Sequence, residues 1–455
     1  MSEPSALDVE RYIDEAGFTP FHWLLLLLCF LVILLDGYDM AAIAYVAPSL
    51  LEEWGLQKAQ LGPAMSAALF GLAFGALLAG PLADRIGRKP AVVVSVLFFG
   101  AGSLATAWAF SIGSLTALRF ATGLGLGAAM SNAITLLAEY CPSHRRTMAV
   151  SAMLCGFPLG AGAGGFCAGY LIPEFGWRSV LLAGGVAPLL LCALLAWRMP
   201  ESVRYMVLKG QPGARVRAVL ARIRREPLAH VQRFVIGEKA AGGRSAVMAI
   251  VTRPYRLGTL LLWFCCFMSM LVFYMIVNWM PLLLKEAGLP VRQFAQISAL
   301  FPLGGGVGSI LIGWLMDRRE PNKVLALVYL AAGLLAYAVS HAVGNVSQTV
   351  LLGSLVFMMG FMSGGGQSAL SSLAAGFYPT HCRATGVGGM LGIGRFGAIS
   401  GVLAGAELLR LQWDGASIFS MLLVPAWLVC AALLLKYYSS VKRRPDDGLV
   451  TAQAR

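Results

Sequence analysis

The chain has 455 residues, of which 58% are hydrophobic and 13% are charged, and its mean hydropathy is +0.74. Soluble domains contain roughly 45–50% apolar and ~25% charged residues, so this composition excludes a soluble, disordered, fibrous or disulfide-rich secreted protein. The net charge of +13 does not indicate a nucleic-acid partner, because the basic residues lie in short loops between apolar segments, as in membrane proteins.

Twelve apolar segments are long enough to cross a bilayer, since a span requires ~20 residues. The first six are expected at about 21–48, 60–82, 91–110, 113–139, 147–172 and 178–198. The other six are expected at about 257–284, 293–316, 322–342, 347–376, 385–409 and 414–438. This pattern predicts an all-α membrane protein with a cytoplasmic segment (1–20), an N-terminal six-helix half (21–198), a central loop (199–256), a C-terminal six-helix half (257–438) and a tail (439–455).

The basic residues predict the orientation of these spans. With both termini in the cytoplasm, 28 of the 35 Lys and Arg residues lie on the inner side and five lie outside, as the positive-inside rule requires. The central loop holds twelve basic and three acidic residues. We expect it to form short basic helices against anionic lipid of the inner leaflet.

Two inner loops of the first half recur in the second half. Residues 80–85 (GPLADR) recur as residues 313–318 (GWLMDR), an offset of 233. Residues 142–146 (PSHRR) recur as residues 379–383 (PTHCR), an offset of 237. Since both copies lie on the same side of the membrane, the halves are parallel repeats, an arrangement typical of transporters that alternate access around a site near the midplane.

These loops resemble the signatures of the major facilitator superfamily. Residues 80–89 (GPLADRIGRK) are similar to its signature between helices two and three, residues 119–127 to its fourth-helix signature, and residues 200–204 to its motif after helix six. The resemblance covers nearly the whole chain and implies the major facilitator fold. It also implies that the loops close the cytoplasmic side, with their aspartate against a helix N-terminus.

A second group of residues resembles the aromatic acid/proton symporter family of that superfamily. The group comprises residues 35–39 (LDGYD), 47–48, 53–55 and 392–397 (GIGRFG). The resemblance implies uptake of benzoate-type anions such as 4-hydroxybenzoate and protocatechuate into bacteria. The chain departs from the family after Met130, where serine and asparagine follow instead of the frequent proline.

Two acids in the first span are candidates for proton coupling. Asp36 and Asp39 lie roughly 22 and 27 Å along the expected helix, and their i,i+3 spacing places them on one face. Burial and mutual repulsion favour the protonated form of a carboxylate. The alternative is a solvated outer helix end, but apolar residues continue to Val46. The repeat places Ser269 and Val272 at the equivalent positions, so the shared scaffold does not require these acids.

Two arginines also lie within spans. Arg395, near the middle of the eleventh span, is a candidate to hold a substrate carboxylate with its bidentate guanidinium. The alternative is a structural arginine neutralised by an acid or by backbone carbonyls. Arg119 in the fourth span can pair with Asp36 or Asp39, or bind substrate, and pairing is favoured.

An aromatic acid needs apolar walls and a few polar groups that orient it. The candidates to line such a pocket are Tyr38, Tyr274, Asn278, Trp279 and Gln367, although ordinary packing is an alternative for each aromatic residue. For the inner loops, the alternative to a gating role is plain positive-inside topology, which does not explain the aspartates and glycines. Glu139 and Glu201 are expected in the same charge network. The expected gating residues are Gly80, Asp84, Arg85, Gly87, Arg88, Lys89, Gly313, Asp317 and Arg318.

These residues and the resemblance predict a proton-coupled symporter that imports small aromatic carboxylates by alternating access. Protonation of the aspartates would permit anion binding at Arg395, and inward rocking would release both. We expect a monomer in the bacterial inner membrane, with substrate, protons and lipid as partners and no cofactor besides the coupling proton. No catalytic or metal site is expected, because no nucleophile–base pair, CxxC or Cys/His cluster occurs.

Two other functions are alternatives for this sequence. A proton/drug or organic-anion antiporter would carry a glycine-proline signature in the fifth span, where residues 156–165 (GFPLGAGAGG) are glycine-rich but do not match it cleanly. A non-transporting membrane sensor would need a signalling domain, for which the central loop is too short.

Overall fold

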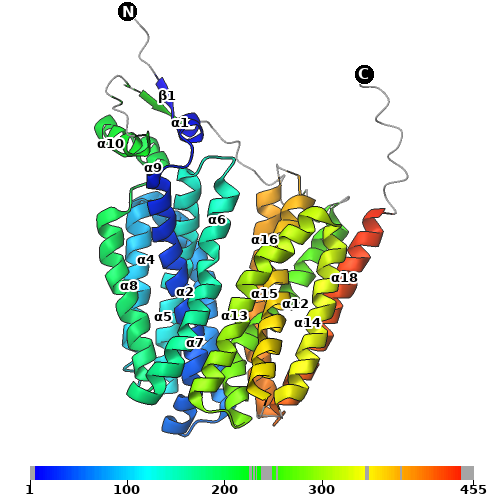
Figure 1. The fold of residues 1–455 in the computed structure, drawn as a ribbon. Helices are drawn as coiled ribbons and strands as arrows, with labels where there is room; N and C mark the ends of the chain where they lie inside the picture. Colours follow the sequence, from blue (N-terminus) through cyan, green and yellow to red (C-terminus); the bar gives the residue numbers. More distant parts are fainter. Residues whose placement is uncertain are drawn as a thin grey trace, which may run out of the picture. The chain divides into compact units, whose positions relative to one another are not determined.

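The computed structural model describes residues 6–224, 228, 231, 233–236, 248, 250–252, 255–343, 348–379 and 382–441. Within these residues it contains twelve helical segments long and apolar enough to cross a membrane, which confirms the expected twelve spans (Figure 1). The expected central loop and tail are described only in part. Residues 225–227, 229–230, 232, 237–247, 249, 253–254 and 442–455 lie outside the described residues.

The helices of the first six spans follow the apolar segments, with two differences. The first helix ends at Trp54, six residues beyond the expected end of the span at residue 48. The apolar pattern marks the part of a helix that suits the bilayer, and the helix itself can continue into charged residues. The fifth span is divided at Cys155, where Pro158 offers no N–H to the carbonyl of Leu154. The helices are α2 (Pro20–Trp54), α3 (Leu61–Ile86), α4 (Arg88–Thr106), α5 (Ile112–Tyr140), α6 (Arg146–Leu154), α7 (Gly156–Phe175) and α8 (Arg178–Arg198), and a short 3-10 helix, η1 (Lys58–Gln60), precedes α3.

The second six spans repeat this pattern, and their last span is divided as well. It breaks at Leu422, which lies four residues after Ile418 and three residues before Pro425. Because proline has no N–H, the carbonyl four residues before Pro425 lacks its helical hydrogen-bond partner. The helices are α12 (Arg256–Glu286), α13 (Val291–Arg318), α14 (Pro321–Val343), α15 (Thr349–Phe377), α16 (Arg383–Arg410), α17 (Gly415–Met421) and α18 (Leu423–Val441).

Short elements cover the inner end of the first six spans, the end expected in the cytoplasm (Figure 1). The central loop forms the expected short helices, α9 (Val203–Leu208) and α10 (Gly213–Arg224), and the N-terminal segment forms α1 (Val9–Glu15). Strands β1 (Ala6–Asp8) and β2 (Arg233–Val235) pair in parallel. The sequence did not predict these strands, because three residues are too few to show a period of two.

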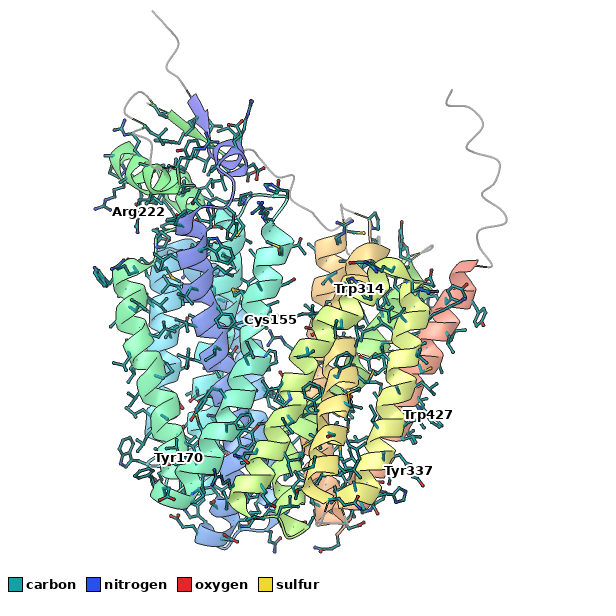
Figure 2. The ribbon with its side chains drawn as sticks, viewed as in Figure 1. Cys155, Tyr170, Arg222, Trp314, Tyr337 and Trp427 are labelled. Carbon is teal, nitrogen blue, oxygen red and sulfur yellow. The ribbon has the colours of Figure 1, made fainter. Side chains whose placement is uncertain are left out.

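Helix α10 is held to the N-terminal segment by one basic residue. The Arg224 side chain donates to the Tyr12 carbonyl at 3.2 Å and pairs with Glu15 at 3.3 Å. The apolar face of α10 is buried, whereas Arg222 is exposed on α10 (Figure 2). The apolar face of α10 therefore packs within the protein, and contact between its basic face and anionic lipid stays a prediction.

The outer surfaces of the helices carry exposed apolar side chains. Tyr170, Trp314, Tyr337 and Trp427, labelled in Figure 2, are each at least 40% exposed. Soluble monomers rarely expose so many large apolar groups, so this surface suits a bilayer.

The described chain divides into two compact units. One comprises residues 1–46 and 63–240, and the other comprises residues 47–62 and 241–455. The first unit therefore holds most of α2 together with α3–α8, while the outer end of α2 and η1 pack with α12–α18. The boundaries of the domains expected from sequence stay a prediction.

Helices α2 and α7 of the first unit touch backbone to backbone. A Cβ added to Gly160 of α7 would lie 1.8 Å from the Leu34 carbonyl oxygen of α2. In the second unit, a Cβ added to Gly397 of α16 would lie 2.2 Å from the Phe267 carbonyl oxygen of α12. The offsets of 237 and 233 relate these two contacts residue for residue.

A second helix pair repeats in the same way. A Cβ on Gly71 of α3 would lie 2.1 Å from the Phe120 carbonyl oxygen of α5, and a Cβ on Gly304 of α13 would lie 2.1 Å from that of Phe357 on α15. Offsets of 233 and 237 again relate the four residues. The internal repeat of the sequence is therefore a repeat of the helix crossings.

These crossings predict that the loss of folding stability caused by one added methyl group on α16 depends on its position. Gly397→Ala should destabilise the protein by about 1–3 kcal/mol, because the backbone of α12 must move. Gly388→Ala on the same helix is the matched control, since nothing lies within 4 Å of its added Cβ. Thermal unfolding in detergent measures both variants, and equal melting temperatures would contradict the proposed crossing.

Candidate functional site

A buried ion pair joins α2 and α5 in the first unit. Asp39 and Arg119 are both 0% exposed. The two terminal nitrogens of Arg119 lie 3.2 Å from Asp39 Oδ1 and 3.0 Å from Oδ2, and one of them also donates to the Asp39 carbonyl at 3.0 Å. Asp39, one of the two acids that the sequence offers as partners, thus contacts Arg119 in this structure.

The second acid lies close to this pair on the same helix. Asp36 is 1% exposed. A Cβ on the adjacent Gly37 would lie 2.1 Å from the Phe157 carbonyl oxygen of α7, so α7 packs directly against α2 between the two aspartates. Two carboxyl groups and one guanidinium are therefore enclosed by protein, where each charge needs a partner or a proton.

Tyr38 lies between the aspartates in sequence and faces α8. Its hydroxyl donates to the Val180 carbonyl at 3.0 Å, and a Cβ on Gly184 would lie 3.0 Å from its ring. Because the hydroxyl hydrogen is already donated, the ring edge or face is the part of this residue that we expect to contact a ligand.

The other predicted pocket residues lie in the second unit. The Asn278 amide donates to the Tyr274 carbonyl at 2.8 Å, and the Trp279 indole donates to the Val402 carbonyl at 2.9 Å. Trp279 is 1% exposed, so in this structure it fastens α12 to α16. Gln367 donates to the Met270 sulfur at 3.4 Å, and Arg395 is half-buried on α16.

The predicted residues therefore form two sets, each within its own unit. Asp36, Tyr38, Asp39 and Arg119 lie in the first unit, and the structure brings Asp39 and Arg119 into contact. Tyr274, Asn278, Trp279, Gln367 and Arg395 lie in the second unit. Their roles in binding stay predictions.

The repeat shows what the fold itself requires at the ion pair. The offsets place Val272 at the position of Asp39 and Val356 at the position of Arg119. Both valines are buried, at 6% and 0% exposure. The second unit therefore has two apolar residues at the equivalent positions, so the shared fold does not require the ion pair.

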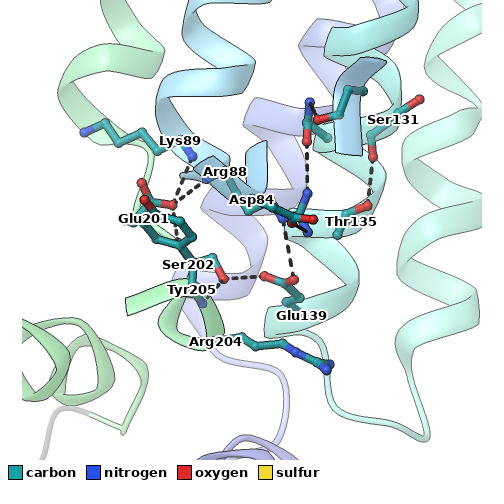
Figure 3. A network of polar contacts seen from close by, with 12 residues as sticks. Asp84, Arg88, Lys89, Ser131, Thr135, Glu139, Glu201, Ser202, Arg204 and Tyr205 are labelled. Atoms are coloured by element: carbon teal, nitrogen blue, oxygen red, sulfur yellow. Dashed lines mark hydrogen bonds and ion pairs between the residues drawn. The ribbon is translucent and has the colours of Figure 1, made fainter. Parts of the chain in front are cut away.

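The inner loop of the first unit forms a polar network around the N-terminus of α4 (Figure 3). Glu201 accepts from the backbone N–H groups of Arg88 at 2.8 Å and Lys89 at 3.1 Å, which places an anion at the positive end of the helix dipole. The Asp84 carboxylate instead pairs with the Arg88 side chain at 2.8 Å. Within this unit, Glu201 is thus the acid that caps α4.

Three further residues tie this cap to α5. Ser202 donates its hydroxyl to Glu139 at 2.5 Å, and Arg88 lies 3.9 Å from the same carboxylate (Figure 3). The Tyr140 hydroxyl donates to the Glu201 carbonyl. The expected charge network of Glu139 and Glu201 is therefore present, with Ser202 as a member that the sequence did not predict.

The corresponding loop of the second unit is built differently. Its Arg318 lies over the Trp314 ring, 4.0 Å from the centroid, and the offset places Tyr438 at the position of Glu201. The nearby Lys436 is 6% exposed and donates to Asn322 at 2.9 Å. Lys436 is one of the 28 basic residues assigned to the inner side from the sequence, and its burial becomes evident only from its packing against α14.

The repeat predicts how variants of the ion pair will behave. Arg119→Val leaves a buried carboxylate without its cation and should destabilise the protein by about 3–5 kcal/mol. Asp39→Val combined with Arg119→Val reproduces the valine pair of the second unit and should restore most of this stability. Unfolding in detergent measures both, and a double variant no more stable than the single one would show that the pair is structural.

The comparisons with known proteins agree with this architecture. A sequence model of the Major Facilitator Superfamily matches residues 29–402. The D-xylose-proton symporter superimposes with a TM-score of 0.70 at 17% identity, covering 90% of this chain and 96% of that one, which shows the same fold.

Curated relatives match at much higher identity. A 4-hydroxybenzoate transporter of Pseudomonas aeruginosa is 48% identical, over 94% of this chain and 96% of its own. A gallate transporter of Pseudomonas putida is 43% identical, over 96% and 97%. The relatives are named as transporters, which confirms the resemblance seen in the sequence motifs. With twelve spans, the repeated crossings and these matches, the chain is a multi-pass membrane transporter that belongs to the Major Facilitator Superfamily.

Proposed function

We propose that this protein imports small aromatic carboxylates together with protons across the bacterial inner membrane, with both termini in the cytoplasm. Relatives named for 4-hydroxybenzoate and gallate, matched over nearly the whole chain, support the substrate class. The observation that carries the coupling is the buried Asp39–Arg119 pair, for which the second unit has two valines. The protein acts as a monomer in lipid and needs no cofactor besides the proton.

The ion pair supplies a proton-sensitive contact between α2 and α5. A proton on Asp39 removes the negative charge that attracts Arg119, so the guanidinium is released for another anion. Asp36, three residues earlier, is the second group that can hold a proton. Proton binding thereby changes how α2 is held in the first unit.

Arg395 is our candidate for the substrate carboxylate. A guanidinium matches a carboxylate with two parallel hydrogen bonds, and the first half has Pro158 at the equivalent position. Gln367 is the candidate for a ring hydroxyl, because its contact with the Met270 sulfur is weak and easily exchanged. Tyr274 and Asn278 complete the polar candidates, while Tyr38 and Trp279 contribute apolar surface only.

Charge conservation constrains the transport step. One proton carried with one monovalent anion moves no net charge, so the membrane potential does no work on it. A second proton would add ~2.3 kcal/mol per 100 mV of potential. Uptake measured at fixed pH gradient and varied potential therefore distinguishes the two stoichiometries.

The test of this function is uptake into proteoliposomes. Labelled 4-hydroxybenzoate should accumulate when an inward proton gradient is imposed and should only equilibrate without one. An aliphatic acid of similar size is the control that shows whether transport requires an aromatic ring. Equal accumulation with and without the gradient would refute proton coupling, and preference for the aliphatic acid would refute the substrate class.

The first prediction on this function concerns the acids of α2. Asp36→Asn and Asp39→Asn should each abolish gradient-driven accumulation, because an amide cannot carry the proton. Since Asp39→Asn also leaves the buried Arg119 without its anion, uptake is compared per amount of folded protein. Substrate exchange down its own gradient should survive in at least one variant. Asp414→Asn, an exposed residue at the start of α17, is the matched control. If both test variants still concentrate substrate, these acids are not the coupling groups.

The second prediction concerns Arg395. Arg395→Lys should weaken substrate binding and Arg395→Ala should weaken it further, because lysine keeps the charge but loses the bidentate geometry. The loss of one charge-assisted contact corresponds to about 1.5–3 kcal/mol, or roughly 10- to 150-fold in affinity. Calorimetry on purified protein measures the substrate affinity of each variant. Arg410→Ala is the control, since Arg410 pairs with Glu407 on the surface.

An analogue of the substrate separates a direct contact from an indirect one. The uncharged amide of the acid should lose little further affinity in Arg395→Ala, since the missing carboxylate and the missing guanidinium belong to the same interaction. If Arg395→Ala binds the acid with wild-type affinity, Arg395 has a structural role and Arg119 becomes the candidate to hold the substrate carboxylate.

A further inference from the structure

The inner end of α2 begins with a cap that contains a histidine. Thr19 precedes the first helical residue, Pro20, and its carbonyl accepts from the backbone N–H groups of His22 at 3.0 Å and Trp23 at 3.3 Å. The Thr19 backbone N–H in turn donates to Nδ1 of the His22 ring at 3.0 Å. This is the arrangement of a capping box, in which the third helical residue is usually Glu or Gln. Here the acceptor is an imidazole nitrogen.

The contacts of the ring determine its protonation state. The Thr19 N–H can only donate, so Nδ1 must offer its lone pair, and the hydrogen of the neutral imidazole is then on Nε2. Nε2 lies 3.0 Å from the Tyr140 carbonyl oxygen of α5, which can only accept. The Thr19 hydroxyl also lies 2.9 Å from Nδ1. We therefore assign the neutral ring, with its hydrogen on Nε2, to His22 in this structure.

The ring of His22 is enclosed by aromatic side chains. It is 0% exposed and stacks on Phe18, with 5.2 Å between the ring centroids, while Phe21 meets it at 5.8 Å. The ionisable groups around this cluster are the Tyr140 phenol and Cys141 thiol at the end of α5, Cys29 two turns further along α2, and Arg222 of α10, which lies over the Phe21 ring. None of these four groups is a carboxylate.

The carboxylates on this side of the first unit have other partners. Glu15 pairs with Arg224, Asp14 accepts from the Ser143 N–H at 2.7 Å, Glu139 accepts from Ser202, and Glu201 caps α4. A positive charge on His22 would therefore be buried without a carboxylate to balance it, which is costly.

A proton on His22 breaks the cap of α2. Protonation places a hydrogen on Nδ1, so the Thr19 N–H then faces a second donor and loses its acceptor. The protonated ring therefore favours an arrangement in which the inner end of α2 leaves this site. Histidine is suited to such a change, because its ordinary pKa of ~6.5 lies within the physiological range.

His22 and Asp39 hold the same two helices together at different heights. Asp39 pairs with Arg119 of α5, and His22, seventeen residues or ~25 Å earlier on α2, donates to the Tyr140 carbonyl of α5. Residues 22–36 contain no proline or glycine, so the helix is continuous between the two contacts. A proton on Asp39 weakens one contact, and a proton on His22 weakens the other.

The contact at His22 also reaches the polar network of the inner loop. The Tyr140 hydroxyl donates to the Glu201 carbonyl, and the Glu201 carboxylate caps α4. One residue of α5 thus joins the inner end of α2 to the start of α4, and the joint depends on the neutral form of one imidazole.

The second unit lacks a histidine at the equivalent position. The offset of 233 relates His22 to Tyr255, and the offset of 237 relates Tyr140 to Phe377. The rings of Tyr255 and Phe377 meet edge to face, with 5.7 Å between their centroids. This contact between aromatic rings requires no particular protonation state, so the shared fold does not require an imidazole here.

We propose that His22 is a positioning residue for the coupling acids of α2 and that it senses the pH of the inner side. The proposal rests on the transport function proposed above. Each cycle of that function delivers a proton to the inner side, where α2 begins. Protonation of His22 then releases the inner end of α2 from α5 and slows further uptake. The ring thus limits proton import when the inner side becomes acidic.

Uptake at different inner pH values tests this proposal. Proteoliposomes take up labelled 4-hydroxybenzoate at an inner pH of about 7.5 or about 5.5, with the same pH difference across the membrane. His22→Gln keeps an acceptor and a donor side by side and does not titrate. Relative to this variant, wild-type uptake should fall roughly 2- to 13-fold at the acidic pH, which corresponds to about 0.5–1.5 kcal/mol for one neutral hydrogen bond.

Two further variants complete the uptake experiment. His144→Gln is the matched control and should keep the wild-type pH profile, because His144 is an exposed histidine in the turn between α5 and α6. His22→Leu makes neither hydrogen bond and should be slow at both pH values, compared per amount of folded protein. A wild-type pH profile in His22→Gln, or wild-type uptake by folded His22→Leu, would overturn the proposal.

Hydrogen exchange measures the cap without transport. Peptides that cover the start of α2 should exchange faster in purified wild-type protein than in His22→Gln at about pH 5.5, because the Thr19 N–H has lost its acceptor, and equally fast at about pH 7.5. Equal exchange at both pH values would overturn the proposal. If the exchange differs as expected but wild-type protein takes up no aromatic acid, the proposed function is wrong, and the pH-sensitive cap remains as a property of α2.

Discussion

Backbone contact at glycine is the constraint on which both units depend. Lipid tails are as apolar as leucine, so helices in a bilayer gain little from hiding apolar side chains and associate by close packing instead. Gly160 and Gly397 bring two helices of each unit to backbone distance, and Gly71 and Gly304 do the same for another pair. These crossings set the rotation of the helices that carry Asp36, Asp39, Arg119 and Arg395.

Function is concentrated where the two units differ. The shared crossings have matching residues in both halves. In contrast, the Asp39–Arg119 pair corresponds to two valines in the second half, and Arg395 corresponds to Pro158 in the first half. At the inner ends, Glu201 caps α4 in one unit, while Lys436 contacts Asn322 of α14 in the other. The duplicated scaffold thus supplies the shared crossings, and the candidates for proton coupling and substrate binding are residues that the other half does not repeat.

The sequence predicted the spans well, because hydropathy over ~20 residues reports the length that a bilayer demands. It narrowed the partner of Arg119 to Asp36 or Asp39 but could not choose, since the two acids are about 60° apart around α2 and the contact of Gly37 with Phe157 sets its rotation. It could not show that the hydroxyl of Tyr38 and the indole of Trp279 are already bonded to carbonyls. Those contacts depend on helix positions that a pattern along one chain does not contain.

The parallel pairing of β1 with β2 has a consequence for synthesis of the protein. Strand β1 is synthesised before the first six spans, whereas its partner β2 is synthesised only after them. At 5–20 residues per second, the N-terminal strand waits roughly 10–50 s for a partner. A nascent chain that ends before Arg233 therefore lacks the strand partner of β1, and the pairing can form only after all six spans of the first half have been made.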